Sequence, residues 1–156
     1  MSYRVGIGVD AHAFADGVPL VLAGVVFDSP RGLAGHSDGD VITHALIDAV
    51  LGAAGLGDIG SLFPSDESTP EGISSLDLLR DALEQLSTAG FDVVNADCVL
   101  IGEQPRISER REELERTLSE LVGAPVSVRA TTTDKLGFTG RGEGLAAQAV
   151  ALLARR

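Results

Sequence analysis

Two of the three histidines in this chain are placed where they could share a metal ion with an aspartate. Asp10 and His12 are two residues apart at the end of a strand-like segment, so both side chains leave the same face. His44 lies in an apolar, helix-like segment, with Asp40 and Asp48 one turn to either side. One carboxylate and two imidazoles form an open zinc site that leaves a position for water or substrate. The spacing alone also fits turn residues and a hydrogen-bonded core histidine. In the metal interpretation, Asp48 could orient the free nitrogen of His44.

A second candidate site is the segment His36-Ser37-Asp38-Gly39-Asp40, just before the helix-like segment. Backbone N–H groups at a helix N-terminus attract phosphate, and Ser37 adds a hydroxyl. A simpler interpretation is that Ser37 or Asp38 caps the helix. The two interpretations are compatible, so the segment predicts a helix cap that can also contact phosphate.

A third cluster combines hydroxyls, charge and glycines near the C-terminus. Thr131-Thr132-Thr133-Asp134-Lys135 is followed by the glycine-rich run 137–144, and Lys135 is the only lysine in the chain. Such a strand-to-helix turn resembles an anion cradle, although the order of residues in a Walker loop is absent. A connector with solvated charges is the alternative. Arg106, after the third strand, is a weaker candidate for the same task, since it also fits a solvated arginine.

Strand-like and helix-like segments alternate along the whole chain, without repeats or linkers. This alternation predicts one α/β domain over residues 1–156, an α+β two-layer arrangement with a mainly four-stranded mixed sheet and helices on one face. Aliphatic and β-branched runs predict the strands, and apolar spacing with N-cap and glycine signals predicts the helices. The expected strands are Arg4–Val9, Leu20–Phe27, Phe91–Ile101 and Val126–Thr132, and the expected helices are Val41–Ala54, Ser74 to Gly90, Ser108–Val122 and Glu143–Ala154.

The composition excludes several classes of protein. The formal net charge is −11, which argues against binding to nucleic acid or to an anionic membrane surface. The one cysteine, Cys98, excludes a disulfide framework and is most simply a small core residue. Without a leader-like start or an apolar run of about 18 residues, the chain is expected to be a soluble cytoplasmic protein.

Four motifs then point to one family. They are Gly8-Val9-Asp10-Ala11-His12-Ala13-Phe14, the segment 36–40, Leu56-Gly57-Asp58-Ile59-Gly60 followed by Phe63-Pro64, and the run 131–144. In this order and spacing the chain resembles the 2-C-methyl-D-erythritol 2,4-cyclodiphosphate synthases over essentially its whole length. The resemblance implies a lyase of the non-mevalonate route to isoprenoids. Such an enzyme closes a ring in 4-diphosphocytidyl-2-C-methyl-D-erythritol 2-phosphate, by attack of the 2-phosphate on the β-phosphorus with release of CMP.

The resemblance also implies cofactors and an assembly. Asp10, His12 and His44 would hold Zn²⁺ or another divalent transition metal. A second divalent ion, Mg²⁺ or Mn²⁺, would bridge the substrate diphosphate with Asp134 among its ligands, although Asp134 stands where the family often has glutamate. The family forms homotrimers with each active site between two subunits. Arg141 and Glu143 would lie near the three-fold axis, where they either line a central cavity or form an interface salt bridge.

Roles for individual residues follow from the same motifs. His36 would be catalytic at the phosphorylated end of the substrate, and Thr132 would help to stabilise the transition state. The remaining substrate contacts implied by the motifs are Asp10, His12, Ser37, Asp58, Ile59, Gly60, Phe63, Pro64, Ser65, Asp66, Glu67, Gly102, Glu103, Gln104, Pro105, Arg106, Thr131, Thr133, Asp134, Lys135, Phe138 and Arg141.

Two other functions remain open on the sequence. A metal-dependent phosphohydrolase could use the same three ligands to activate water, and it would release inorganic phosphate. A non-catalytic trimeric protein could bind phosphorylated ligands without turnover. The product of the reaction discriminates between the three.

Overall fold

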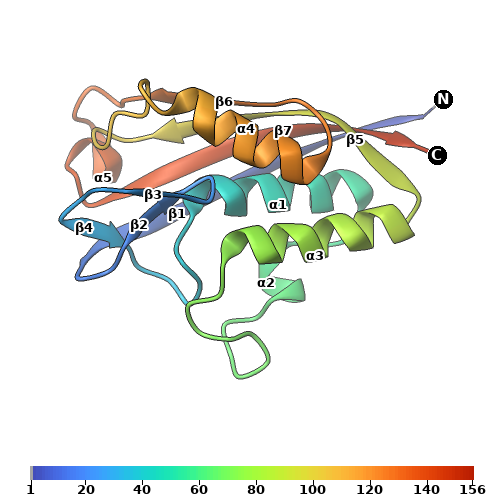
Figure 1. Ribbon diagram of the computed structural model, residues 1–156, viewed down its shortest axis with the longest axis horizontal. Helices are drawn as coiled ribbons and strands as arrows, with labels where there is room; N and C mark the ends of the chain where they lie inside the picture. Colours follow the sequence, from blue (N-terminus) through green and yellow to red (C-terminus); the bar gives the residue numbers. More distant parts are fainter. Residues whose placement is uncertain (1) are drawn as a thin grey trace.

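The computed structural model describes residues 2–156 and contains one five-stranded mixed sheet with helices packed on it (Figure 1). The strand order is β4-β1-β7-β5-β6. Only the β5–β6 pair is parallel among the described pairs of this sheet. A separate two-stranded sheet holds β2 and β3. The strands are β1 Tyr3–Asp16, β2 Leu20–Leu22, β3 Val25–Phe27, β4 Arg31–Leu33, β5 Phe91–Ile101, β6 Val126–Thr131 and β7 Gly144–Arg155.

The last segment of the chain is a strand, so the expected helix Glu143–Ala154 and the expected four-stranded sheet are both wrong. β7 lies between β1 and β5 and pairs antiparallel with both. Its residues alternate between buried Ala147, Ala149 and Ala151 and the more exposed Gln148 and Val150. Because both faces of this alanine-rich strand are largely apolar, the sequence lacks the alternation of apolar and polar residues that identifies a strand, and it resembles a buried helix instead. Tertiary pairing overrides the helix propensity of alanine here.

Helix α1 (Val41–Ala54) is the centre of the core and coincides with the predicted helix. It lies against β1 at two glycines: a Cβ on Gly6 would be 2.0 Å from the carbonyl oxygen of Ala49, and one on Gly8 would be 1.9 Å from that of Ala45. Glycine is therefore required at both positions for the helix backbone to approach the strand. This contact sets the distance between the side chains of β1 and those of α1.

The cap of α1 is Asp40, not Ser37 or Asp38 as the sequence suggested. The fully buried Asp40 carboxylate accepts hydrogen bonds from the backbone of Thr43 and from Ala23 and Gly24. Ala23 and Gly24 have φ of 51° and 76°, and they form the tight turn that divides the expected strand Leu20–Phe27 into β2 and β3. One carboxylate thus joins the start of α1 to this hairpin.

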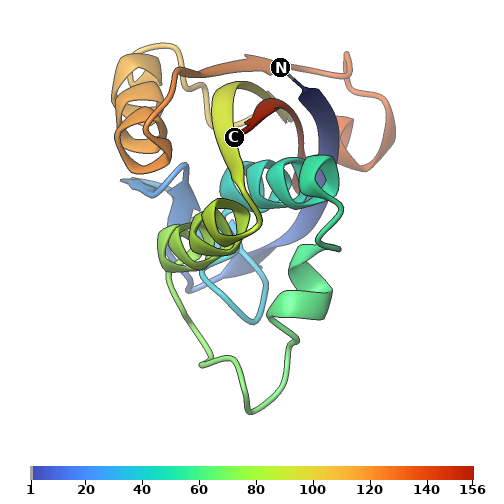
Figure 2. The same cartoon turned by 90° about the vertical axis from the view of Figure 1, so that its right-hand side faces the viewer.

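The other long helices lie on the same side of the sheet as α1 (Figure 2). Helix α3 (Ser75–Thr88) packs on α1, and α4 (Arg111–Val122) lies beside β6 and starts three residues later than predicted. Two single-turn helices, α2 (Ile59–Leu62) and α5 (Gly137–Gly140), lie in segments expected to be loops. Within residues 2–156, none of the helices is long and apolar enough to cross a bilayer.

The opposite face of the sheet is apolar and exposed. Val5, Ile7 and Val9 of β1 are 56–70% exposed, and Val150 of β7 pairs with Ile7 and is 46% exposed. Gly6 and Gly8, which alternate with these residues, face α1. The sheet therefore has helices on one face, as predicted, and a bare aliphatic surface on the other.

Candidate functional site

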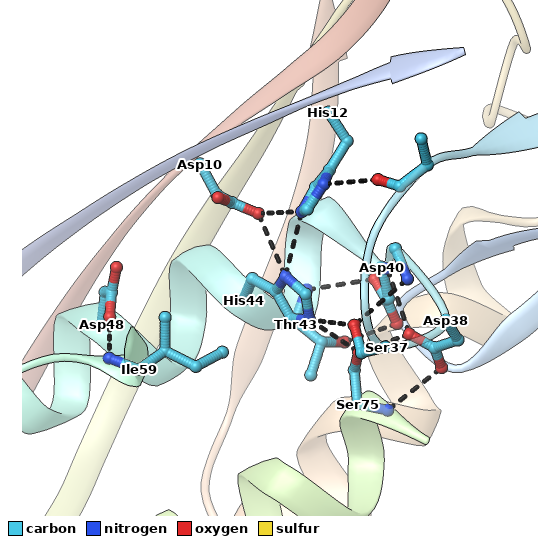
Figure 3. Close-up of polar contacts among 12 residues, drawn as sticks. Asp10, His12, Ser37, Asp38, Asp40, Thr43, His44, Asp48, Ile59 and Ser75 are labelled. Carbon is cyan, nitrogen blue, oxygen red and sulfur yellow. Dashed lines mark hydrogen bonds and ion pairs between the residues drawn. The ribbon is translucent and has the colours of Figure 1, made fainter. Parts of the chain in front are cut away.

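Three ligand atoms meet between β1 and α1, where the sequence predicts a metal (Figure 3). Oδ2 of Asp10 lies 2.7 Å from Nε2 of His12 and 3.1 Å from Nδ1 of His44. The two nitrogens are 3.1 Å apart. On a tetrahedral zinc ion, ligand atoms about 2 Å from the metal are about 3.3 Å from one another. The three atoms are therefore close enough to share one metal ion, with the Asp10–His12 pair at hydrogen-bond distance and shorter than on zinc.

The hydrogen bond at Nδ1 of His12 turns the other ring nitrogen, Nε2, toward the position of the metal. Its Nδ1 donates to the carbonyl oxygen of Ala34, 2.8 Å away. A neutral imidazole that donates from Nδ1 has its lone pair on Nε2, the atom that faces Asp10 and His44. A borderline metal such as zinc suits this set of two nitrogens and one carboxylate oxygen.

Electrostatics within the triad favour a charged pair when no metal is bound. Burial disfavours ionisation of Asp10, but hydrogen bonds and charge interactions with His12 and His44 outweigh it and lower the pKa of Asp10 to about 2. Burial also disfavours charge on His12, yet the hydrogen bond from His12 to Asp10 and the carboxylate charge raise the pKa of His12 above its ordinary value. A proton on Nε2 of His12 thus occupies the position that a metal ion would take.

The other two aspartates of the α1 stripe are not part of this group. The suggestion that Asp48 orients His44 is wrong, because Oδ1 of Asp48 accepts from the backbone N–H of Ile59 at 2.7 Å. Asp40 caps the helix, as described above. On its far side, His44 meets two serines: Nε2 lies 3.0 Å from Oγ of Ser37 and 2.8 Å from Oγ of Ser75.

A pocket of about 170 Å³ opens on the triad. His36 is held at its wall by a hydrogen bond from Nε2 to the carbonyl oxygen of Thr69. The pocket contains many of the predicted residues and two that sequence reasoning missed, Thr69 and Leu78. Its lining is Asp10, His12, His36, Ser37, His44, Ile59, Gly60, Phe63, Ser65, Thr69 and Leu78.

Within the segment 58–67, four residues predicted to contact substrate do not line this pocket: Asp58, Pro64, Asp66 and Glu67. Asp58 instead caps α2, where its Oδ1 accepts from the N–H of Ser61 at 2.8 Å. Oδ1 of Asp66 accepts from the backbone N–H of Ser68 in the loop that follows. Their contacts with substrate stay predictions.

A second, larger pocket of about 540 Å³ lies at the ends of β5 and β6. It includes the predicted residues of the loop 102–106 together with Thr131 and Thr132. It also contains two arginines that the sequence did not single out, Arg111 and Arg129. Its full lining is Gly102, Glu103, Gln104, Pro105, Arg106, Ile107, Ser108, Arg111, Arg129, Ala130, Thr131 and Thr132.

The turn after β6 has the strained backbone of a specialised loop. Asp134 and Lys135 both have positive φ, 53° and 67°, which is unfavourable for residues with a side chain. The turn is tied to the pocket by a hydrogen bond from the N–H of Lys135 to Oε1 of Glu103. Oγ1 of Thr133 donates to the carbonyl oxygen of Leu136 within the turn. Lys135, an exposed side chain, is thereby held close to the second pocket.

Five predicted residues of the C-terminal cluster lie outside the linings of both pockets: Thr133, Asp134, Lys135, Phe138 and Arg141. Asp134 is exposed, and the group of potential metal ligands described in residues 2–156 does not include it. Phe138 is also largely exposed. Arg141 forms an ion pair of 2.6 Å with Glu143 of the same chain, with both side chains exposed. Their predicted roles at a second metal, at the substrate and near the three-fold axis stay predictions.

The chain is similar to known proteins over nearly its whole length. Residues 3–154 match the model of the YgbB family. The 2-C-methyl-D-erythritol 2,4-cyclodiphosphate synthase of Rubrobacter xylanophilus is 55% identical over 159 residues, which cover 98% of this chain and 96% of that protein. The bifunctional IspDF from Campylobacter jejuni superposes with a TM-score of 0.95 at 37% identity, over 99% of this chain and 43% of that one. The CDP complex of IspF from Plasmodium falciparum superposes with a TM-score of 0.85 at 31% identity, over 99% and 97% of the two chains.

These matches in sequence and in fold confirm the resemblance that the four motifs indicate. Because residues 3–154 match the family model and Asp10, His12 and His44 come together as a possible metal site, the chain belongs to the YgbB family, as a relative of the 2-C-methyl-D-erythritol 2,4-cyclodiphosphate synthases.

Proposed function

We propose that this protein converts 4-diphosphocytidyl-2-C-methyl-D-erythritol 2-phosphate into 2-C-methyl-D-erythritol 2,4-cyclodiphosphate and CMP. An oxygen of the 2-phosphate forms a bond to the β-phosphorus. The bond from that phosphorus to the bridging oxygen breaks, and its electron pair leaves with CMP. The observation that carries the proposal is the convergence of Asp10, His12 and His44 on one pocket, in a chain of this family. The enzyme would be a lyase of isoprenoid biosynthesis.

Such a ring closure needs alignment of two phosphates more than it needs a protein nucleophile. His36 and Ser37 stand in the wall of the metal pocket, where they would hold the phosphorylated end of the substrate. Oγ of Ser37 accepts from the N–H of Gly39 and lies 3.0 Å from Nε2 of His44. When that nitrogen carries the proton of His44, Ser37 accepts from it too, and the hydroxyl proton of Ser37 is available to a phosphate oxygen. Ile59, Gly60 and Phe63 would exclude water from the methylerythritol part.

Asp10, His12 and His44 would hold Zn²⁺, and Asp134 would help to hold Mg²⁺ or Mn²⁺ on the diphosphate. When bound, these ions would act as Lewis acids that offset the charge of the reacting phosphates. The second pocket would bind the cytidine diphosphate portion. There Thr132, Arg106 and the nearby Lys135 would provide donors for the leaving CMP. These local positive charges would make the site attractive to an anionic substrate, although the chain as a whole carries a net charge of −11.

A homotrimer with active sites between subunits would bring the two pockets together. Within one chain, Asp10 and Arg129 belong to strands β1 and β6, which are separated by β7 and β5. By the pairing register, their side chains leave opposite faces of the sheet. The exposed aliphatic surface of β1 and β7 is the kind of face that a partner covers. A second copy packed on this surface could present its nucleotide pocket to the metal pocket of the first.

We take residues 1–156 as one cyclodiphosphate synthase domain, since the family match spans nearly all of them. Cytoplasmic location, and the absence of nucleic-acid and membrane partners, stay predictions from composition and charge.

Product analysis tests the proposed function. The purified protein is loaded with zinc, supplied with magnesium and incubated with the cytidyl substrate, and nucleotides and inorganic phosphate are quantified. Release of CMP without inorganic phosphate is the expected result. Release of inorganic phosphate would instead indicate a phosphohydrolase, and binding of the substrate without any product would indicate a non-catalytic binding protein.

A further inference from the structure

The His44 imidazole has its two nitrogens in different surroundings. Nδ1 faces Asp10 and His12, whereas Nε2 faces two hydroxyls, that of Ser75 at 2.8 Å and that of Ser37 at 3.0 Å (Figure 3). Ser75 is the closer of the two and is fully buried. His44 can present a lone pair to a metal at Nδ1 only if its proton is on Nε2. Whatever decides the direction of the hydrogen bond between His44 and Ser75 therefore decides whether His44 can act as a ligand.

Asp38 decides that direction. Oγ of Ser75 donates a short hydrogen bond to Oδ1 of Asp38, and the backbone N–H of Ser75 donates to Oδ2 at 3.0 Å. The carboxylate is itself oriented by the N–H of Asp40, 3.1 Å from Oδ1. Because a serine hydroxyl has one proton, a Ser75 that donates to Asp38 can only accept from His44.

The chain of hydrogen bonds is buried where it reaches the imidazole. Ser75 is fully buried and His44 is 7% exposed. Competition from water is therefore weak, and the direction of each bond is set by the protein. In His12, the hydrogen bond from Nδ1 to the backbone carbonyl oxygen of Ala34 fixes the position of the proton in the same way. Of the two imidazoles, only His44 has the position of its proton set by side chains of other segments, since Asp38 precedes α1 and Ser75 begins α3.

We propose that Ser75 and Asp38 are positioning residues of the metal centre, which keep the proton of His44 on Nε2 so that Nδ1 faces the ion. This inference rests on the proposed metal centre. The first residue of α3 would thus orient a metal ligand in addition to packing on α1. Partners of this kind typically change metal affinity by about 10- to 100-fold.

Ser75→Ala removes the hydroxyl but keeps the backbone N–H that Asp38 accepts, so the start of α3 is retained. Asp38→Asn replaces an acceptor oxygen with a donor, so Ser75 is no longer required to donate to residue 38. The matched control is Ser74→Ala on the same turn, since the Ser74 side chain makes no capping hydrogen bond.

Two readouts on metal-free protein separate positioning from simple stabilisation. Zinc affinity is measured by competition with a chromophoric chelator. The tautomer of His44 is read from long-range ¹H–¹⁵N spectra of histidine-labelled protein at pH 8.5. For Ser75→Ala and Asp38→Asn we expect zinc affinity to fall by about 10- to 100-fold, with a loss of the Nε2-protonated form, whereas Ser74→Ala matches the wild type.

The proposal is overturned if Ser75→Ala and Asp38→Asn bind zinc as tightly as the wild type, whatever their melting temperatures. It is equally overturned if zinc affinity falls while His44 keeps its proton on Nε2. A wild-type protein that binds no zinc would contradict the metal centre itself, and so the proposed function, before any variant is compared.

Discussion

The Asp10 carboxylate lies 2.7 Å from Nε2 of His12, and each side chain moves the pKa of the other in the direction that stabilises an ion pair. Asp10 has its pKa lowered to about 2, so its contribution is present above its ordinary pKa and is lost as the pH falls toward 2. His12 has a raised pKa, so its contribution is present below its ordinary pKa and is lost as the pH rises through the raised value. The metal-free pair therefore stabilises the fold most between about pH 4 and about pH 6.5.

This window gives a prediction for the metal-free protein. The melting temperature of the wild type should exceed that of Asp10→Asn by more at pH 5.5 than at pH 8.5. Added zinc should reverse the trend, because zinc must displace the proton of His12 and so stabilises the wild type more at pH 8.5. Thermal unfolding at both pH values, with chelator and with zinc, measures this. An Asp10→Asn effect that is the same at both pH values would contradict the assigned pair.

The contact of Gly8 with α1 gives a second prediction. Gly8→Ala places a Cβ 1.9 Å from the carbonyl oxygen of Ala45, next to His44, so α1 must move away from β1. We expect a loss of about 3 kcal/mol of stability or more and weaker zinc binding, as seen by denaturant unfolding and chelator competition. Gly52→Ala, in the same helix with no close contact, is the control and should stabilise the protein by about 0.5–1 kcal/mol. Equal effects of the two substitutions would refute the close-approach argument.

The exposed sheet face gives a third prediction. The wild type should sediment as a trimer of the 16.1 kDa chain, and Ile7→Glu should yield monomers that still bind zinc but have lost turnover. A charge at this position would remain unpaired in the interface. The control is Val26→Glu, which is similarly exposed (61%) but lies on β3 in the small sheet, and it should leave the trimer intact. Full activity in monomeric Ile7→Glu would rule out a site shared between subunits.

Lys135 gives a fourth prediction, for substrate binding. Lys135→Ala removes an exposed ammonium beside the second pocket, and a charged hydrogen bond to phosphate is worth about 1.5–3 kcal/mol. We expect KM for the cytidyl substrate to rise about 10-fold or more in steady-state assays, with little change in melting temperature. The control Arg80→Ala removes an exposed cation on α3 that pairs with Asp77. If Lys135→Ala leaves KM at the wild-type value, Lys135 does not bind the substrate.

Much of the fold could be predicted because local signals agree with the tertiary structure. The sequence predicts the bounds of helix Val41–Ala54 to the residue, through an apolar run closed by Gly55. It predicts those of strand Phe91–Ile101 equally well, through a run of β-branched and aliphatic residues. The final strand could not be predicted. Its exposed positions include apolar residues such as Val150, so the alternation that identifies a half-buried strand was masked. The exposed apolar face of the sheet and the hidden strand period have the same cause, since both arise from apolar side chains at the exposed positions of the strand.

The site shows the same division between local and long-range information. Asp10 and His12 share a strand face, so their proximity follows from spacing alone. The contacts of His44 cannot be inferred from spacing, because Ser75 is 31 residues away and reaches His44 only through the packing of α3 on α1. The spacing along the helix favours Asp48 as the residue that orients His44, but Asp48 instead accepts a hydrogen bond from the backbone N–H of Ile59, the first residue of α2. Residues that orient a ligand from another element leave no periodic signal in a sequence.

Phosphorus NMR of the reaction mixture shows directly whether the protein closes the cyclic diphosphate. With zinc and magnesium present, the cytidyl substrate should be converted into CMP and one cyclic diphosphate, without inorganic phosphate. The same protein treated with chelator, and His44→Ala with zinc resupplied, should leave the substrate intact. Inorganic phosphate as the product, or full turnover by His44→Ala, would contradict a metal-assisted ring closure at the Asp10, His12 and His44 centre.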